Sequence, residues 1–127
     1  MSDTTTRGIR IQVRSEFDRE HSSPSDGAYL FHYHVRISNV GKETAQLISR
    51  EWIITNADGE VERHSGEGVI GQQPLLAPGA VHEYTSFCTL NTPVGSMQGK
   101  YQMTTPTGET FDAVIAPFTL AVPHALN

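Results

Sequence analysis

The chain has 127 residues, of which 37% are hydrophobic and 18% are charged, a composition that excludes a disordered chain and permits one buried core. The formal net charge of −5 argues against a general phosphate-backbone binder, so we expect no nucleic acid partner. We expect a single domain over residues 1–127, with an ordered core over about residues 7–121 and a loose tail at each end.

The first half of the chain alternates apolar and polar side chains, which is the period of a β-strand. Residues 9–13 alternate in this way, and residues 29–37 place aromatic and branched side chains on one face. The proline and glycine in residues 24–27 predict a turn before the second of these strands. Two half-buried strands are therefore expected here.

The central segment mixes the two faces of a strand. The even positions of residues 48–54 are largely apolar, but Arg50 interrupts them and Ile53 lies on the other face. This pattern is typical of a central strand that is partly covered on both faces. The Asp-Gly pair in residues 56–59 predicts a hairpin, and Trp52 is expected to be a large aromatic side chain buried in the core.

Three further strands are expected in the second half, over residues 81–90, 97–103 and 111–120, with turns at residues 77–79 and 105–108. The apolar phase of the last strand shifts after Pro117, which predicts a bulge or an edge position. Tyr84 and Tyr101 are both candidates for a tyrosine that ties a corner through its hydroxyl. Since no window shows a capped helical stripe, we predict an all-β fold, an antiparallel two-sheet β-sandwich.

Residues 66–71 match the glycine-rich phosphate fingerprint as a string, with Gly66, Gly68 and Gly71 at the glycine positions. That chemistry needs a helix after the glycines, and Pro74 and Pro78 oppose one. A loop that uses glycines for positive φ angles is the favoured interpretation. A nest of backbone amides that binds an anion stays open as the alternative.

His32 and His34 are two residues apart in a predicted strand, so both imidazoles leave the same face and can supply two metal ligands. A competent site needs a third ligand, for which the candidates are His21, His64, His82 and Glu51. No spacing selects one of them. A solvated polar face is the favoured interpretation, and we predict no resident cofactor.

Nothing in the sequence resembles a catalytic constellation, so we predict that the protein is not an enzyme. Cys88 lies in a predicted strand, where a free cysteine is mostly a small buried hydrophobe. A lone cysteine without a signal-peptide pattern or a membrane-spanning run predicts a cytoplasmic protein without membrane insertion. The apolar residues 75–78 are expected either to cap the core or to form an exposed contact patch.

The longer pattern of residues 66–79 resembles the bacterial ApaG family. It is accompanied by similar motifs in residues 50–59, 84–86, 92–97 and 99–103, and the likeness extends over about residues 7–117. The resemblance implies a fibronectin type III-like or immunoglobulin-like sandwich. It also implies an association with cobalt and magnesium resistance or efflux, and a pyrophosphate-binding proposal that falls on Gly66, Gly68 and Gly71. Related domains in eukaryotic F-box proteins look like partner-recognition modules.

We therefore expect a non-enzymatic protein–protein interaction module whose edge strands and glycine-rich loop present the contact surface. The partner is an unidentified protein, and weak association into a homodimer is a further option. The alternative is a regulatory protein that binds an anion or nucleotide pyrophosphate at residues 66–71, or a divalent cation at His32 and His34.

Overall fold

Strands account for most of the chain that the structure describes, which is residues 1–123 of a computed structural model. Their bounds in chain order are β1 (Ser2–Thr6), β2 (Ile9–Ser23), β3 (Ala28–Asn39), β4 (Ala45–Asn56), β5 (Val61–Glu67), β6 (Leu75–Leu76), β7 (Val81–Leu90), β8 (Val94–Thr104) and β9 (Thr110–Ala121). The helical content of residues 1–123 is one 3-10 turn, η1 (Pro24–Asp26), at the turn predicted before β3. No helix among these residues has the length and apolar character of a membrane span.

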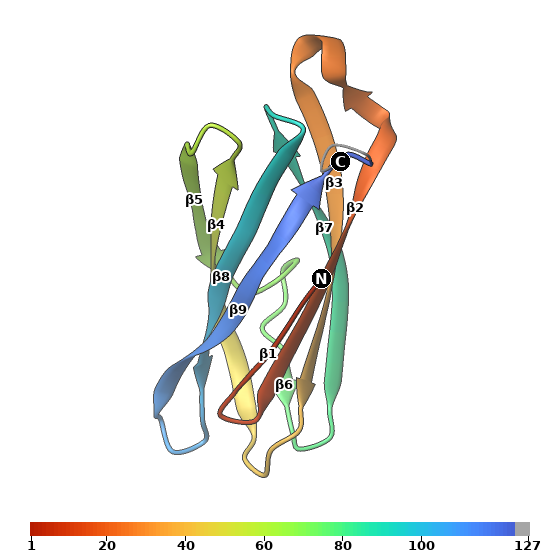
Figure 1. Cartoon of the computed structure of the whole chain (residues 1–127). Coiled ribbons are helices and arrows are strands. Elements are labelled where there is room, and N and C mark those ends of the chain that lie inside the picture. Colours follow the sequence, from red (N-terminus) through yellow and green to blue (C-terminus); the bar gives the residue numbers. More distant parts are fainter. Residues whose placement is uncertain (124–127) are drawn as a thin grey trace.

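The strands form two antiparallel sheets that lie face to face as two layers (Figure 1). One sheet has the order β1-β2-β3-β7, and the other has the order β5-β4-β8-β9 with β6 paired to one end of β4. The chain passes from one sheet to the other after β3, after β6 and after β7. This arrangement confirms the predicted all-β, antiparallel two-sheet sandwich.

Aromatic rings fill the centre of the core between the two sheets. Trp52 of β4 is only 3% exposed, as predicted from its central strand. Its ring meets those of Tyr33, Tyr101 and Phe118 edge-on, with ring centroids 5.2, 6.2 and 6.1 Å away. Edge-to-face pairs of this kind stabilise a core beyond the area that they bury.

Two bulges set which side chains face the core. The register between β8 and β9 shifts near Pro117, which confirms the bulge predicted from the change of apolar phase. A second shift lies in β4, between Leu47 and Ser49. Because the bulge adds one residue to β4, the core face passes from the odd positions Ala45 and Leu47 to the even positions Arg50 and Trp52. This second bulge explains the mixed pattern of the central strand.

The prediction of a loose tail over residues 1–6 is wrong for residues 2–6, which form β1 and pair with β2. The two strands are joined by Arg7 and Gly8, whose φ angles of 47° and 81° are typical of a two-residue hairpin turn. The sequence of β1 is polar, so it carries no apolar alternation, and its pairing depends on backbone hydrogen bonds. The predicted C-terminal tail lies largely outside the described residues.

On one side of the sandwich, β1 and β2 of the first sheet lie beside β9 of the second. The Val114 amide donates to Thr6 Oγ1 at 3.1 Å, and Ser15 Oγ donates to the Thr119 carbonyl at 2.8 Å. These bonds link the edges of the two sheets. We call this the closed side. At one end of the molecule, the β2–β3 hairpin around η1 projects beyond the other strands (Figure 1).

Candidate functional site

The opposite side of the sandwich is open. Its edge strands β5 and β7 each pair with a single neighbouring strand within residues 1–123, and they do not pack against each other as β1 and β9 do. The Asn56 amide donates to the Glu60 carbonyl and the Asn39 amide donates to the Ala80 carbonyl, both at 3.0 Å. Bonded and non-bonded pairs alternate along an antiparallel ladder, so the odd-numbered residues of β5 and β7 direct their N–H and C=O groups away from their partner strands. Both strands therefore present free hydrogen-bonding edges.

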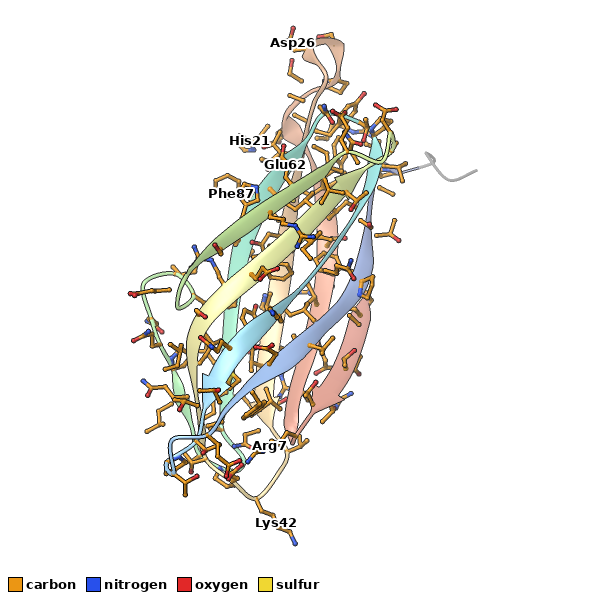
Figure 2. The ribbon with its side chains drawn as sticks, turned by 90° about the vertical axis from the view of Figure 1, so that its left-hand side faces the viewer. Arg7, His21, Asp26, Lys42, Glu62 and Phe87 are labelled. Carbon is orange, nitrogen blue, oxygen red and sulfur yellow. The ribbon has the colours of Figure 1, made fainter. Side chains whose placement is uncertain are left out.

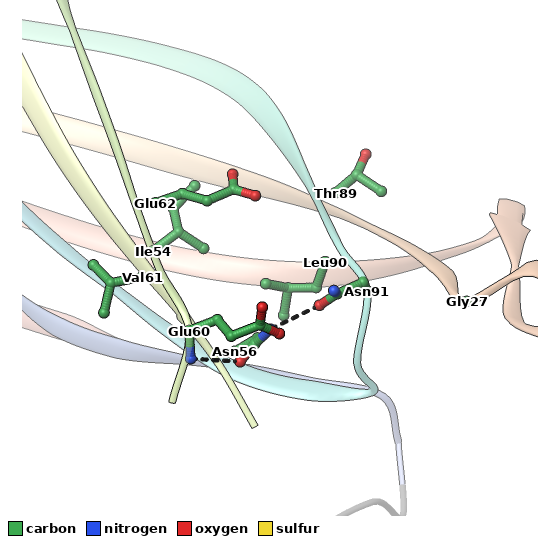
Figure 3. Close-up of a pocket in the computed structure, with 9 residues that line it drawn as sticks. All are labelled: Gly27, Ile54, Asn56, Glu60, Val61, Glu62, Thr89, Leu90 and Asn91. Atoms are coloured by element: carbon green, nitrogen blue, oxygen red, sulfur yellow. Dashed lines mark hydrogen bonds between the residues drawn. The ribbon is translucent and has the colours of Figure 1, made fainter. Parts of the chain in front are cut away.

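Between these edges lies an opening that we call the inter-sheet cleft. It consists of two neighbouring cavities of about 330 and 270 Å³, which share Ile54, Glu62 and Thr89 in their walls. The larger cavity is also lined by Tyr33, Arg50, Trp52, His64, Ser86, Phe87, Cys88 and Met97. At the end of the smaller cavity, Asn56 Nδ2 donates to Asn91 Oδ1 at 2.9 Å, which bridges the two sheets (Figure 3).

Arg50 is the charged side chain at the inner wall of the cleft. It lies on the core face of β4, opposite the fully buried Tyr101 of β8 and opposite Gly66 of β5. A Cβ at Gly66 would come within 2.8 Å of Arg50 Nη2, so the guanidinium occupies the space that the glycine leaves. Arg50 Nη1 donates to the carbonyls of Glu67 and Gly68 at 2.9 and 2.8 Å. The guanidinium is thereby fixed at the mouth of the sandwich.

A hydroxyl pair joins the two sheets close to this arginine. The hydroxyls of Tyr84 on β7 and Tyr101 on β8 hydrogen-bond to each other. Burial raises the pKa of both phenols, and the charge of Arg50 opposes that rise. The prediction that one tyrosine ties a corner is therefore wrong in form, because the two candidates bind each other and link the two sheets.

The glycine-rich segment of residues 66–71 forms a strand end and a tight turn, and residues 72–123 after it contain no helix. Gly68 has a φ of 60°, and a Cβ there would lie 2.2 Å from the Gln72 carbonyl oxygen. Ile70 and Gly71, at φ 48° and 73°, are the central residues of a two-residue turn closed by bonds between Val69 and Gln72. The amides of Gly68, Val69 and Gln72 all donate within the chain, so they are not free to bind an anion.

The structure places His32 and His34 on one face of β3, as predicted, but with separate partners. His32 Nε2 lies 2.7 Å from Asp18 Oδ2, which also lies 2.8 Å from His21 Nδ1. His34 Nε2 lies 3.1 Å from Glu83 Oε1. Among residues 1–123, no group of three or more His, Cys, Asp or Glu side chains is placed to hold a metal ion.

The rim of the cleft on β7 combines an exposed ring with a half-buried thiol. Phe87 is 64% exposed, and Figure 2 shows it on the same side of the molecule as Glu62. Burial raises the pKa of the neighbouring Cys88 thiol to about 12, so this thiol stays protonated at neutral pH. Of the predicted apolar patch at residues 75–78, Leu76 is buried in the core and Leu75 is exposed.

Sequence reasoning missed Arg50 as a site residue, although it marked the place where Arg50 breaks the apolar phase of β4. A charged side chain at an apolar position of a central strand is the available signal, because charged groups are seldom buried without a partner. What the sequence does not show is the bulge in β4 and the pairing of Arg50 with Gly66. Both depend on contacts between strands.

Comparison with known proteins gives one consistent match. Residues 19–105 match the family model described as the ApaG domain. The relative named Protein ApaG from Anaeromyxobacter dehalogenans strain 2CP-1 is 56% identical over 127 residues, which cover both chains completely. Protein ApaG from Thiobacillus denitrificans is 51% identical over 119 residues, or 94% of each chain. The crystal structure of a Bordetella pertussis protein that bears the name ApaA aligns with a TM-score of 0.89 and 47% identity, covering 92% of this chain and 95% of that one.

Proposed function

Because the chain belongs to the ApaG family, whose fold is a small fibronectin type III-like sandwich, we propose that it is a non-enzymatic protein–protein interaction module. The observation that carries this proposal is the pair of free strand edges, β5 and β7, on either side of the inter-sheet cleft. Exposed edges are templates for pairing with another chain, and soluble proteins usually cover or interrupt them. An edge that is kept free beside a cleft therefore fits recognition of a partner segment.

The mode of binding that we propose is addition of an extended partner segment to β7. The odd-numbered residues of β7 supply the free N–H and C=O groups, which are spaced along the ten residues of this strand. Phe87 stands in the middle of this edge as an exposed aromatic anchor. Strand addition draws its affinity from main-chain hydrogen bonds and its specificity from pockets for alternate side chains, which the cleft provides.

The non-enzymatic character of the proposal is supported by the chemistry of the cleft. Cys88 is the nucleophile type with the greatest intrinsic reactivity there, and its raised pKa keeps it as a thiol. The histidine of the cleft is also engaged, since His64 Nε2 lies 3.2 Å from Glu62 Oε2. A cytoplasmic location, in which this free thiol stays reduced, remains a prediction.

The alternative, a regulatory protein that binds an anion or a divalent cation, has less support. Three amides of the glycine-rich turn already donate within the chain, and His32 and His34 have different carboxylate partners. The association with cobalt and magnesium efflux, which the family resemblance implies, stays a prediction about the pathway in which the partner acts. Titration with cobalt and with pyrophosphate, followed by amide chemical shifts, tests this alternative.

Selection from a displayed library of random peptides of about ten residues, the upper length of an ordinary strand, tests the main proposal. Enriched peptides are then assayed against the wild type, Phe87→Pro and Phe87→Ala by calorimetry. We expect Phe87→Pro to abolish binding, because it removes a free N–H from the β7 edge without breaking the ladder to β3. Phe87→Ala, which keeps that N–H, should only weaken binding.

Circular dichroism and thermal unfolding establish whether each variant is folded. Thr85→Pro, at another outward-facing position of β7, replaces Phe87→Pro if that variant does not fold. A library that yields no binder contradicts the proposal. So does a folded Phe87→Pro protein that binds the peptides as tightly as the wild type does.

A further inference from the structure

We propose that the inter-sheet cleft selects partner segments that carry one acidic side chain, and that Arg50 binds its carboxylate. This inference rests on the proposed function, since it names the chemistry of the segment that would occupy the cleft. It is carried by the position of one guanidinium: inside the mouth of the sandwich, in a cavity, and without a carboxylate partner.

The position of Arg50 is built into the strands around it. The bulge in β4 turns Arg50 to the core face, where its cross-strand neighbours are Tyr101 and Gly66. On the β8 side the buried tyrosine leaves no exit, and on the β5 side the glycine leaves an open path over the strand. The guanidinium follows that path, since a Cβ on Gly66 would meet Nη2 at 2.8 Å and Cζ at 3.0 Å. The bulge and the cross-strand neighbours thereby hold a positive charge at the cleft, in a half-buried position.

The charge of Arg50 is not matched within the chain. The ion pairs within 4 Å in residues 1–123 involve other cations, and none includes Arg50. Only Nη1 donates to protein acceptors, the carbonyls of Glu67 and Gly68. Nε and Nη2 have no acceptor among the described residues. A planar guanidinium with two free donors matches the geometry of a carboxylate, and a partly buried charge without a counter-ion is costly until it is paired.

The cavity beside Arg50 has room and additional donors for that carboxylate. Its volume is about 330 Å³, and the hydroxyl-bearing side chains Tyr33 and Ser86 line it together with Arg50. Each hydroxyl can donate one hydrogen bond to a carboxylate oxygen. Trp52 forms an apolar part of the same wall, and it would contact the methylene groups of an acidic side chain. The lining therefore suits an Asp or Glu side chain that points inward from a strand lying along β7.

The charges on the rim limit the partner to few acidic groups. The hairpin of residues 50–67 contains five acidic and two basic residues, so its net charge is −3 of the −5 carried by the whole chain. Glu60 lines the smaller cavity, and Glu62 lines both cavities, including the one beside Arg50. A segment with many carboxylates would be repelled by this rim, whereas one carboxylate in a neutral or basic segment would be accepted. Rejection of like charge is a common source of specificity at interfaces.

Parallel selections from the same random peptide library test the inference. The three baits are the wild type, Arg50→Gln and Arg63→Gln. Arg63→Gln is the matched control, because it removes the same charge from the adjacent strand. Unlike Arg50, Arg63 has a carboxylate partner, since its Nη1 lies 3.4 Å from Glu51 Oε1. We expect wild-type and Arg63→Gln selections to enrich one acidic residue at a fixed position, and Arg50→Gln selections to lose that preference.

Affinities of one enriched peptide make the test quantitative. Replacing its acidic residue by the matching amide should weaken wild-type binding about tenfold or more, the value of a hydrogen bond to a charged group, and should have little effect on Arg50→Gln. Gly66→Ala, which displaces the guanidinium, should behave as Arg50→Gln does. Excess inorganic phosphate should displace little of the bound peptide, because phosphate cannot replace the main-chain hydrogen bonds to the strand edge.

The outcomes separate the inference from the proposed function. Binders without a preferred acidic position, or an amide peptide that binds the wild type as tightly, would overturn the carboxylate assignment while the interaction module stands. Enrichment of a basic residue at one peptide position would also overturn it, and would indicate that the acidic rim binds the partner instead. If no bait enriches any peptide, the interaction module fails and the carboxylate assignment fails with it.

Discussion

On one side of the sandwich, hydrogen bonds join the edges of the two sheets, whereas on the other side β5 and β7 stand apart around the inter-sheet cleft. The closed side uses β1, a strand with no large apolar side chain, to cover the edge of β2 and to reach β9. The open side has no such strand within residues 1–123. The two sides therefore differ in whether the edge strands of the two sheets pack against each other: β1 and β9 do, whereas β5 and β7 do not.

The two sides also differ in how their sheets are held together. On the closed side the links lie at the surface, as in the bond from the Val114 amide to Thr6 Oγ1. On the open side one link, the Asn56–Asn91 bond, lies at the end of the smaller cavity, and the other lies inside, where the hydroxyls of Tyr84 and Tyr101 meet. An internal link leaves the strand edges free for a partner. On the open side, buried groups therefore hold the two sheets together, and the strand edges at the surface stay free for recognition.

The largest effect should come from the floor of the cleft. Trp52 lines the larger cavity, yet it is buried among the rings of Tyr33, Tyr101 and Phe118. Trp52→Ala should lower the free energy of unfolding by about 3–5 kcal/mol, the usual cost of removing a buried tryptophan. Urea denaturation measures it, with Trp52→Phe as the smaller change. A loss near zero would mean that the cleft extends through the core and that the sandwich is not packed on its open side.

The internal link of the open side predicts coupling between its two hydroxyls. Tyr84→Phe and Tyr101→Phe should each cost about 1–3 kcal/mol, because each leaves the other buried hydroxyl without its partner. The double variant should cost less than the sum of the two, since it leaves no orphaned group. Denaturation of the four proteins gives the coupling energy. Strictly additive losses would show that the pair does not hold the sheets together.

The sequence predicted this link only in part. It identified Tyr84 and Tyr101 as the tyrosines with a structural hydroxyl, and it identified Trp52 and the bulge at Pro117, because these follow from apolar phase along single strands. It could not show that the two tyrosines face each other, since they lie on strands of different sheets. The same limit applies to Arg50, whose direction depends on the register of β4 against β8.

The glycine-rich segment shows the same division between local and long-range information. Positive φ angles at Gly68 and Gly71 follow from local turn chemistry, and the sequence predicts them. The role of Gly66 is different, because it makes room for Arg50 of the neighbouring strand. A motif string reports that a glycine is present, and only the pairing of strands shows which neighbour needs it. β1 was missed for a related reason, since its polar sequence has no pattern to read.

Two turns with nearly the same backbone allow a smaller comparison of the two sides. Arg7 and Ile70 both have φ near 48°, and both precede a glycine. Arg7, at one end of the closed side, pairs with Glu43 and Glu109. Ile70, at the glycine-rich turn, is exposed. Ile70→Asn should therefore raise the free energy of unfolding by about 1 kcal/mol, because asparagine tolerates this conformation and a β-branched side chain does not.

Arg7→Asn is the matched control for that change. It relaxes the same backbone conformation, but it also removes the ion pairs and the contact of the guanidinium with the Phe111 ring, 5.1 Å from its centroid. The gain should therefore be smaller than that of Ile70→Asn, or absent. Thermal unfolding of the two variants compares them directly. Equal gains would indicate that the contacts of Arg7 add nothing to the closed side.

The smallest effect is expected at acid pH, near the base of the projecting β2–β3 hairpin. The hydrogen bond from His32, supported by His21, lowers the pKa of Asp18 to about 2, and His32 lies opposite Phe87 of the open edge. The carboxyl of the unfolded chain titrates near 3.8, so the folded state holds its proton less tightly. Stability from Asp18 is therefore complete above this value and is lost as the pH falls from about 4 towards 2.

Asp18→Asn should flatten the decline of stability over that window, and Asp58→Asn in the exposed β4–β5 turn should leave it unchanged. Urea denaturation at a series of acid pH values measures both slopes against the wild type. The amide cannot replace the charge that both imidazoles face, so the variant should also be less stable at neutral pH. If both variants keep the wild-type slope of unfolding free energy against pH, the acid sensitivity comes from other groups. The contact of Asp18 with His32, next to the open edge, would then add no stability.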